Sequence, residues 1–319
     1  MTATWQFRRG LSFLFGMGQP ITILGAGAIG CALAAAWRAA GAEVHLVARS
    51  ARTGANPVRF ADGDVLDAGP VHAGLTGAPI SGLVVVTVKA TAIEGVAGTL
   101  AQIPKDTPIL SLLNGPYSAT ALGDLLGRPV HAGMVPWNVV RDPAGWRVSG
   151  AGDVTVDHAL KGILPETPRA PTTYSADIEG VLWGKLLLNL VNPVNALSGH
   201  PLPQMLAHGL HRARYRAAYV EALGILRAAG IRPAKVAPLP PRLIPHVLAM
   251  PDPIFRRVFL PLQRLEAGAT TSMAQDVAAG RVTEIDWING AVVTLAHKVG
   301  MQAPVNAALV ADIRALSPH

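Results

Sequence analysis

Cysteine is almost absent from this chain of 319 residues, because Cys31 is the single one. A lone cysteine excludes an intrachain disulfide framework and fits a reducing compartment, so we expect a cytoplasmic protein. The sequence also lacks Cys and His clusters with metal-ligand spacing, and we expect no metal. No apolar run reaches the roughly 18 residues that a membrane span needs, so we expect no membrane association.

Charge is scarce as well, at 15% of the residues against 50% hydrophobic residues, which excludes a disordered chain. The net charge is +7, but the basic residues are scattered, so we expect no nucleic-acid partner. A modest positive field could steer anionic small molecules, or simply reflect an arginine-rich composition. Only six of the 27 basic residues are lysine. A desolvated lysine can lose a proton and an arginine cannot, so each retained lysine is a candidate for proton chemistry.

The strongest local pattern is a strand, a glycine loop, a helix and a second strand. Ile21–Leu24 is a short apolar run, an alanine-rich stretch predicts a helix that stops at Gly41, and Glu43–Arg49 predicts the second strand. This context makes the GxGxxG spacing informative and indicates dinucleotide binding, the alternative being a glycine-rich turn in an unliganded domain. The expected pyrophosphate loop consists of Gly25, Ala26, Gly27, Ala28, Ile29 and Gly30.

The end of the second strand favours NADP over NAD. NAD enzymes usually place an acid there, whereas an arginine suits the 2′-phosphate of NADP. Here the strand ends at Arg49, and the only nearby acid, Glu43, stands at its wrong end. We expect Arg49 to bind the 2′-phosphate with Arg52 as a helper, the alternative for both being a solvated loop charge.

Two further strands end in polar residues. Leu83–Val88 leads to Lys89, and Ile109–Leu113 leads to Asn114. Ligands of open α/β sheets bind beyond the carboxyl ends of the strands, so both residues are candidate site residues. Alternatively, Lys89 is a surface charge before the helix expected over 91–100, and Asn114 is a turn residue. More strands are expected over 130–137, 146–149 and 153–157.

The character of the sequence changes near Asp177, after which helical periodicity dominates. We predict an α/β fold in which a Rossmann domain with a doubly wound parallel sheet covers 21–175 and an all-helical domain covers 176–319. Residues 1–20 form an N-terminal extension. Residues 1–16 are either a disordered extension or the result of an upstream start codon, with Met17 as the true first residue.

The first helix of the second domain carries an unusual polar stripe. Lys185, Asn189 and Asn192 are spaced i, i+4, i+7 among Trp and Leu, so on one helix they share a face. They form either a satisfied buried network or a substrate-facing stripe whose lysine has a pKa lowered towards neutrality. Farther on, Thr283-x-x-Asp286 predicts a capping box with Glu284 in the first turn of a helix ending near Lys298. Glu284 could alternatively only complement the helix dipole.

The intervening sequence is expected to be structural. Leu202–Gly230 predicts one helix with a solvated basic face of Arg212, Arg214 and Arg216. The proline-rich segment 233–261 predicts mostly loop with one short helix.

Together these blocks resemble the ketopantoate reductase (2-dehydropantoate 2-reductase) family, in order and spacing from residue 21 to about 305. The resemblance implies an NADP-binding Rossmann domain, a helical domain, and the NADPH-dependent reduction of ketopantoate to pantoate in pantothenate biosynthesis. The motifs that carry it are Gly25–Gly30, Val88-Lys89-Ala90, Leu113-Asn114-Gly115, Trp183-Gly-Lys185-Leu-Leu-Leu-Asn189, Asn192-Pro193, Ser272-Met273-Ala-Gln-Asp276 and Thr283-Glu284-Ile285-Asp286.

The resemblance also implies roles. Lys185 corresponds to the general acid and Glu284 to a glutamate needed for substrate binding and catalysis. Asn189, Asn192 and Ser272 would bind the anionic 2-oxoacid substrate. Lys89 and Asn114 would lie beside the nicotinamide and the reacting carbonyl, and Arg49 would select NADP.

The sequence departs from the family pattern in three places. Pro116-Tyr117 replaces a frequent glycine, Asn192 comes one residue early relative to Lys185, and the segment 233–261 is long. Three alternatives therefore stay open: a same-fold reductase for another 2-oxoacid or an imine, a non-catalytic NADP sensor, and a structural protein. A homodimer is compatible with the sequence.

Overall fold

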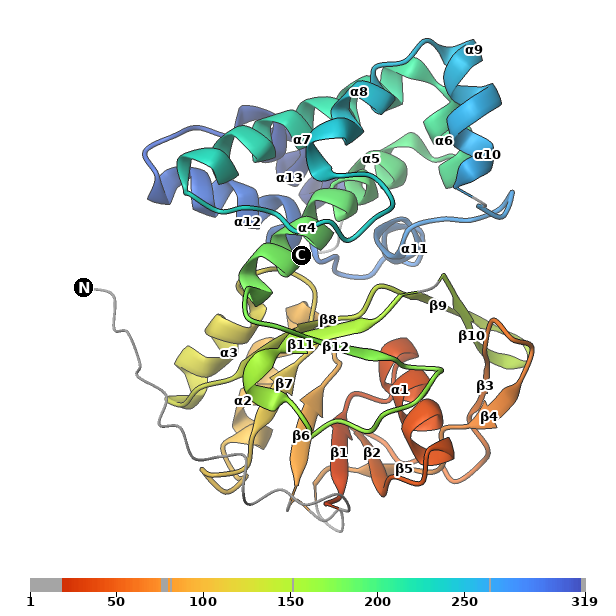
Figure 1. The fold of residues 1–319 in the computed structure, drawn as a ribbon, viewed down its shortest axis with the longest axis vertical. Coiled ribbons are helices and arrows are strands. Elements are labelled where there is room, and N and C mark those ends of the chain that lie inside the picture. Colours follow the sequence, from red (N-terminus) through yellow and green to blue (C-terminus); the bar gives the residue numbers. More distant parts are fainter. Residues whose placement is uncertain (1–18, 76–79, 81, 151, 264, 317–319) are drawn as a thin grey trace. The chain divides into compact units, whose positions relative to one another are not determined.

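The computed structural model describes residues 19–75, 80, 82–150, 152–263 and 265–316. The expectations for residues 1–16 and Met17 concern a part of the chain outside these ranges. Two compact units make up the structure. The first consists of Met1–Val88, Ala92–Leu113 and Ala119–Ile178, and the second of Lys89–Thr91, Asn114–Ser118 and Glu179–His319. Figure 1 traces both.

The first unit is built on an eight-stranded sheet in the order β12-β11-β8-β7-β6-β1-β2-β5. All neighbours pair in parallel except β11 and β8. With β1 in the middle and the chain winding outwards to both sides, this is the doubly wound arrangement of dinucleotide-binding domains, and the predicted fold class is confirmed. The strands are β1 (Ile21–Leu24), β2 (Val44–Ala48), β5 (Val71–Ala73), β6 (Leu83–Val86), β7 (Ile109–Ser111), β8 (His131–Met134), β11 (Val154–Asp157) and β12 (Thr172–Ser175).

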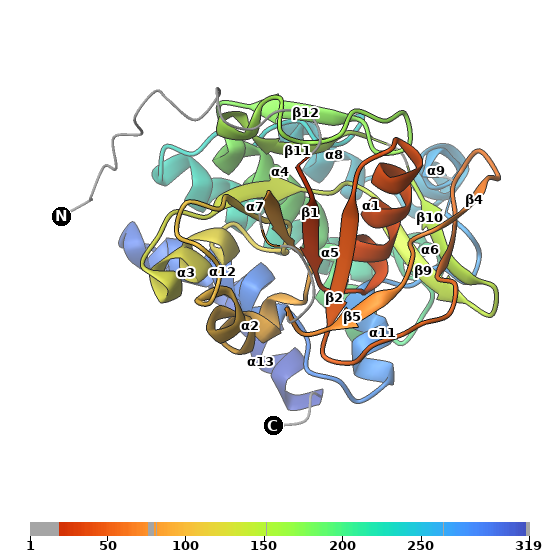
Figure 2. The same cartoon turned by 90° about the horizontal axis from the view of Figure 1, so that it is seen from below.

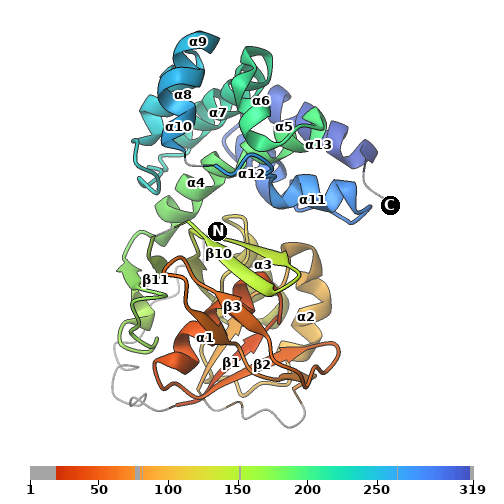
Figure 3. The ribbon, with the colours of Figure 1, turned by 90° about the vertical axis from the view of Figure 1, so that its right-hand side faces the viewer.

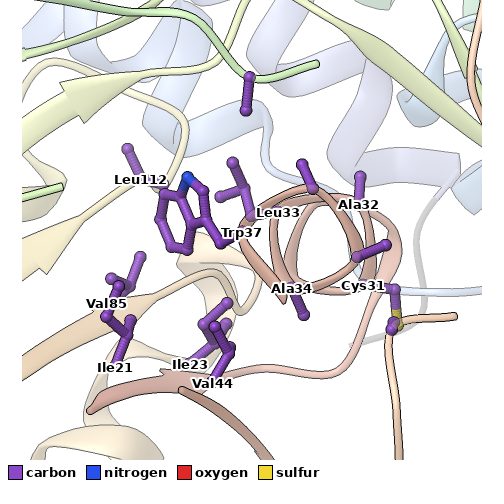
Figure 4. Close-up of a cluster of buried hydrophobic side chains, with 14 of the residues drawn as sticks. Ile21, Ile23, Cys31, Ala32, Leu33, Ala34, Trp37, Val44, Val85 and Leu112 are labelled. Carbon is purple, nitrogen blue, oxygen red and sulfur yellow. The ribbon is translucent and has the colours of Figure 1, made fainter. Parts of the chain in front are cut away.

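Helices cover both faces of this sheet, with α1 on one side and α2 and α3 on the other (Figures 2 and 3). A second sheet, in the order β4-β3-β10-β9, packs on α1. The core between α1 and the large sheet holds the fully buried Trp37, with Leu33 and Leu112 close to its indole ring (Figure 4). These elements are α1 (Ala28–Ala39), α2 (Ile93–Leu100), α3 (Ser118–Leu126), β3 (Pro57–Arg59), β4 (Val65–Asp67), β9 (Asn138–Asp142) and β10 (Gly145–Ser149).

The second unit is helical, as predicted. Its longest helix, α7, packs against α5, α12 and α13 (Figures 1 and 3). Trp183, Tyr219 and Leu309 are fully buried in this core. The helices are α4 (Ile178–Asn189), α5 (Val191–Ser198), α6 (Leu202–Ala207), α7 (Gly209–Ala228), α8 (Ile244–Leu248), α9 (Asp252–Ile254), α10 (Leu260–Leu262), α11 (Ser272–Ala278), α12 (Ile285–Lys298) and α13 (Pro304–Leu316).

Two predictions for this unit are wrong. The single helix expected over 202–230 is broken at His208, which has extended backbone between α6 and α7. The segment 233–261 is not mostly loop, because α8, α9, a π-helical turn over Phe255–Phe259 and α10 follow one another there. The two helical stretches of this segment begin at Pro241 and at Asp252-Pro253, and proline in the first turn of a helix costs no hydrogen bond.

Arg212, expected to be solvated, is 2% exposed. Its guanidinium donates to the carbonyl oxygens of Leu206 at 2.8 Å, Leu248 at 3.3 Å and Met250 at 2.8 Å, and to Asp252 Oδ1 at 2.6 Å. It also lies 4.3 Å from the centre of the Phe255 ring. One arginine on α7 thus holds the short helices of the proline-rich segment in place.

We expect Arg212→Met to destabilise the protein by about 3–5 kcal/mol, because it leaves buried carbonyl groups and a carboxylate without their donor. Chemical denaturation gives the free energy of unfolding. The matched control is Arg214→Ala on the same helix, which removes only an exposed ion pair to Asp312 and should cost about 1 kcal/mol or less. Equal losses in the two variants would contradict a structural role for Arg212.

Candidate functional site

The glycine loop of the first unit is tight. Gly25 follows β1 with φ +121°, and a Cβ there would lie 2.8 Å from Val88 N. A Cβ at Gly30 would lie only 1.9 Å from Gly25 O, the same carbonyl that accepts a hydrogen bond from Thr87 Oγ1 at 2.7 Å. A Cβ at Gly27 would meet no atom within 4 Å. The loop therefore needs glycine at two positions for close packing, and at the third the backbone faces open space.

The N-terminus of α1 is suited to a phosphate. Gly27 is the N-cap residue, no side chain caps it, and the first turn carries no acid. The first N–H groups of a helix point outwards and carry partial positive charge, so they favour an anion. The open space at Gly27 and this uncapped helix start fit the pyrophosphate of a dinucleotide.

Two arginines near this loop have different surroundings. Arg52 Nη2 donates to Ala26 O in the loop at 2.6 Å, and the Arg52 backbone pairs with Val71. Arg49 is exposed and directly follows β2, and within the described residues no hydrogen bond or ion pair engages it. Arg52 thus supports the loop, whereas the Arg49 guanidinium is available to a ligand.

In the second unit, the carboxylate of Glu284 is the centre of a polar cluster. Glu284 is 8% exposed. Its Oε1 accepts a hydrogen bond from Ala90 N at 2.8 Å, and its Oε2 accepts one from Asn114 Nδ2 at 2.8 Å. Next to Asn114, Gly115 has φ +93°, and a Cβ there would lie 2.5 Å from Trp287 O on α12. Glycine thus lets the Asn114 segment approach the start of α12.

The predicted capping box is wrong. Glu284 is the N-cap residue of α12 rather than a first-turn residue. Thr283 Oγ1 is buried and has no hydrogen-bond partner among the described residues, and Asp286 pairs with Arg314 at 2.7 Å. The Glu284 carboxylate binds Ala90 and Asn114 instead of the start of its own helix.

Lys89, the residue before Ala90, forms an ion pair with a second acid, Asp276. Lys89 Nζ is 2.5 Å from both carboxylate oxygens of Asp276 on α11. Arg281 Nε donates to Asp276 Oδ1 at 2.9 Å. Asp276 has no role predicted from the sequence. The available signal was its position three residues after the buried Met273, on the inward face of a short helix.

Lys185 lies on α4, in the same unit. Burial lowers its pKa to about 8, and the negative charge of Glu284 opposes that shift. The preceding residue, Gly184, allows the segment around Ala234 to approach α4 closely, because a Cβ at Gly184 would lie 2.4 Å from Ala234 O. The direction of this pKa shift is the one that the substrate-facing alternative predicts for Lys185.

The predicted single polar stripe is interrupted. Asn189 is the last residue of α4 and is half-buried, whereas the buried Asn192 belongs to α5. The structure instead brings Asn192 to the start of α11, where Thr271 Oγ1 donates to Asn192 O at 3.5 Å. Ser272, the exposed first residue of α11, follows directly.

Asn195 was missed by the sequence analysis. Its Oδ1 accepts a hydrogen bond from Thr271 N at 3.0 Å, and its Nδ2 donates to His200 O at 2.8 Å. Thr271 in turn caps α11, since its Oγ1 accepts from Ala274 N at 3.3 Å. Asn195 therefore holds the segment that presents Ser272.

Tyr117, the departure from the family pattern, packs on the helical core. Its ring meets that of Trp183 edge-on at 5.8 Å, and Lys298 Nζ lies 4.3 Å from its centre. Burial raises the pKa of Tyr117 to about 12, so its hydroxyl is neutral at physiological pH. Trp183 lies two residues before Lys185 on α4. Tyr117 thus packs the Asn114 segment against this part of α4.

The described part of the chain lacks both a cluster of metal-binding side chains and a membrane-spanning helix. It contains no group of three or more His, Cys, Asp or Glu side chains arranged to hold a metal ion. No helix in it combines the length and the apolar character that crossing a membrane requires.

Comparison with known proteins identifies two matching family models. The model described as ketopantoate reductase PanE/ApbA matches residues 21–160, and that described as ketopantoate reductase PanE/ApbA C terminal matches residues 177–317. A 2-dehydropantoate 2-reductase from Pyrococcus horikoshii is 25% identical, over 92% of this chain and 96% of its own length.

Solved structures share the fold. A PanE/ApbA family ketopantoate reductase from Ralstonia eutropha JMP134 superposes with a TM-score of 0.76 at 24% identity, covering 93% of this chain and 98% of that one. A D-mandelate dehydrogenase, solved with NADH and anilino(oxo)acetate, gives 0.75 at 19% identity, with coverage of 93% and 98%.

Proposed function

The chain belongs to the ketopantoate reductase family of oxidoreductases, and from this premise we propose that it reduces 2-dehydropantoate to pantoate with NADPH. The observation that carries the proposal is the pKa of Lys185, which burial lowers and the negative charge of Glu284 partly raises again. A group with a pKa of about 8 can donate a proton near neutral pH and regain it from solvent, which an arginine could not do. A protein that only binds the cofactor needs no such group.

NADPH, when bound, supplies the hydride. The N–H groups of the loop Gly25–Gly30 would hold its pyrophosphate, and Arg49 its 2′-phosphate. Lys89 and Asn114 would contact its nicotinamide half. We place this reaction in the cytoplasm, where the buried free thiol of Cys31 stays reduced.

The chain's own contribution to the reaction is a proton. As hydride reaches C2 of the 2-oxoacid, the C2 oxygen takes a proton from Lys185 Nζ and becomes the hydroxyl of the product. Lys185 is then neutral and regains a proton from solvent. Glu284 keeps the pKa of Lys185 from falling further, so that a useful fraction is charged at neutral pH. Asn189, Asn192 and Ser272 would bind the carboxylate and hydroxyl groups of the substrate.

A second candidate is a same-fold reductase for a 2-oxoacid with another side chain. Two observations favour it. Tyr117 stands where the family pattern has glycine, and a D-mandelate dehydrogenase has a similar fold. Because Tyr117 is tied to Trp183, it would change the space left for the substrate side chain.

The test of both candidates is NADPH oxidation by the purified protein with ketopantoate, benzoylformate and a series of branched 2-oxoacids. We expect ketopantoate to give the highest kcat/KM. Preference for benzoylformate would support the second candidate, and cofactor binding without turnover of any compound would refute a reductase of these acids.

Lys185→Ala should lower kcat by a factor of roughly 10² to 10⁴, the usual effect of losing a positioned acid, while NADPH still binds. In the wild type the protonated lysine is the active form, so the rate of reduction should fall as pH rises through about 8. Glu284→Gln should move this decline to lower pH, since it removes the charge that raises the pKa. Rate measurements from pH 6 to 10 give both results, and an unshifted decline in Glu284→Gln would contradict the electrostatic link.

Arg49→Ala should weaken NADPH binding roughly 10- to 100-fold, the equivalent of one lost charged hydrogen bond, and leave NADH binding within about 2-fold. Fluorescence titration measures both dissociation constants. The matched control is Arg52→Ala, which should weaken both cofactors alike because Arg52 supports the loop through Ala26. An unchanged ratio of the two constants in Arg49→Ala would show that the phosphate binds elsewhere.

A further inference from the structure

Asp276 is a buried acid with two cations and no assigned role. Its side chain is 5% exposed, and it comes from α11, far along the chain from Lys89. A buried charge is costly unless it is paired, and removing one partner of such a pair is strongly destabilising. Asp276 therefore needs a cation beside it, and two are present, Lys89 and Arg281.

The two cations are bound unequally. Lys89 Nζ lies 2.5 Å from each carboxylate oxygen, so the ammonium is centred on the carboxylate. Arg281 reaches only Oδ1, through Nε at 2.9 Å, and its Nη2 donates to Gln275 O at 3.4 Å. Arg281 thus has a second anchor on α11, whereas the ammonium of Lys89 is held at Asp276.

Lys89 needs such an anchor. Its side chain is 46% exposed, and a lysine ammonium on four flexible carbons has no fixed direction of its own. The Lys89 backbone is already restrained, because the next N–H, that of Ala90, donates to Glu284 Oε1 at 2.8 Å. Glu284 therefore fixes the backbone from which the Lys89 side chain starts, and Asp276 fixes the position of the Lys89 ammonium.

We propose that Asp276 is a positioning residue that holds the Lys89 ammonium ready for the nicotinamide half of the cofactor. The proposal rests on the proposed function, in which Lys89 meets the cofactor. Asp276 itself touches neither cofactor nor substrate. Its contribution is that the lysine loses little freedom when the cofactor binds, because it is already ordered.

The test is a double-mutant cycle of Asp276→Asn, Lys89→Met and the combined variant, read by fluorescence and calorimetric titration. The probes are NADPH and 2′,5′-ADP, which lacks the nicotinamide. We expect Asp276→Asn to weaken NADPH binding roughly 5- to 10-fold, the scale of one freed side chain, and to add less than about 2-fold once Lys89 is Met. Binding of 2′,5′-ADP should stay unchanged throughout.

Two controls separate positioning from folding. Arg281→Met removes the other cation and should leave the NADPH constant within about 2-fold, whereas Asp276→Glu keeps the charge and should restore most of the affinity lost in Asp276→Asn. Additive losses in the cycle would overturn the proposal. So would weakened 2′,5′-ADP binding in Asp276→Asn, or an NADPH loss in Arg281→Met as large as in Asp276→Asn.

The cycle also distinguishes this inference from the proposed function. Binding constants need no turnover, so a wild-type protein that binds NADPH but reduces no 2-oxoacid would refute the substrate assignment and still give a result for Asp276. If the protein binds NADH more tightly than NADPH, the same cycle with NADH and ADP tests the role of Asp276. A wild-type protein that binds neither cofactor would overturn both.

Discussion

The buried carboxylate of Glu284 is the constraint on which the polar cluster of the helical unit depends. A charge that is 8% exposed must find hydrogen-bond donors, and Glu284 takes them from Ala90 N and Asn114 Nδ2. These donors come from two segments far from Glu284 in the sequence. The same charge acts on Lys185 and opposes the effect of burial on its pKa. One side chain therefore binds two candidate ligand-binding segments and partly offsets the effect of burial on the proton affinity of the candidate acid.

Features that depend on neighbouring residues could be predicted from the sequence. The GxGxxG loop is an example, because Gly25 and Gly30 are required by atoms a few residues away or next to the adjoining strand. The end of α1 is another, since Gly41 takes the positive φ of +85° that a helix stop favours. The helical character of the second unit and the lowered pKa of Lys185 follow from periodicity and an apolar setting in the same way.

Features that depend on partners far away in the sequence could not be predicted from it. Arg212 follows a surface-like pattern, but most of the acceptors that make its burial favourable, Leu248 O, Met250 O and Asp252 Oδ1, lie more than 30 residues away. Proline-rich composition predicted a loop over 233–261, although proline is well suited to the first turn of a helix. Thr283 and Asp286 have capping-box spacing, but Asp286 pairs with the distant Arg314 instead. The ion pair between Lys89 and Asp276 could not be predicted either, because nothing in the sequence around one residue points to the other.

The division between lysine and arginine follows from their chemistry. Arg212 and Arg52 donate to carbonyl oxygens in fixed positions, where a permanent charge and a rigid fork are needed. Of the six lysines, Lys105, Lys161, Lys235 and Lys298 are exposed and do not contact Asp276 or Glu284, whereas Lys89 pairs with Asp276 and Lys185 is under the influence of the Glu284 charge. As the proposed proton donor, Lys185 must be able to lose its proton, and at Lys89 a compact charge lies 2.5 Å from each carboxylate oxygen of Asp276. An arginine cannot lose its proton, so a chain that otherwise prefers arginine has a physical reason to keep lysine at position 185.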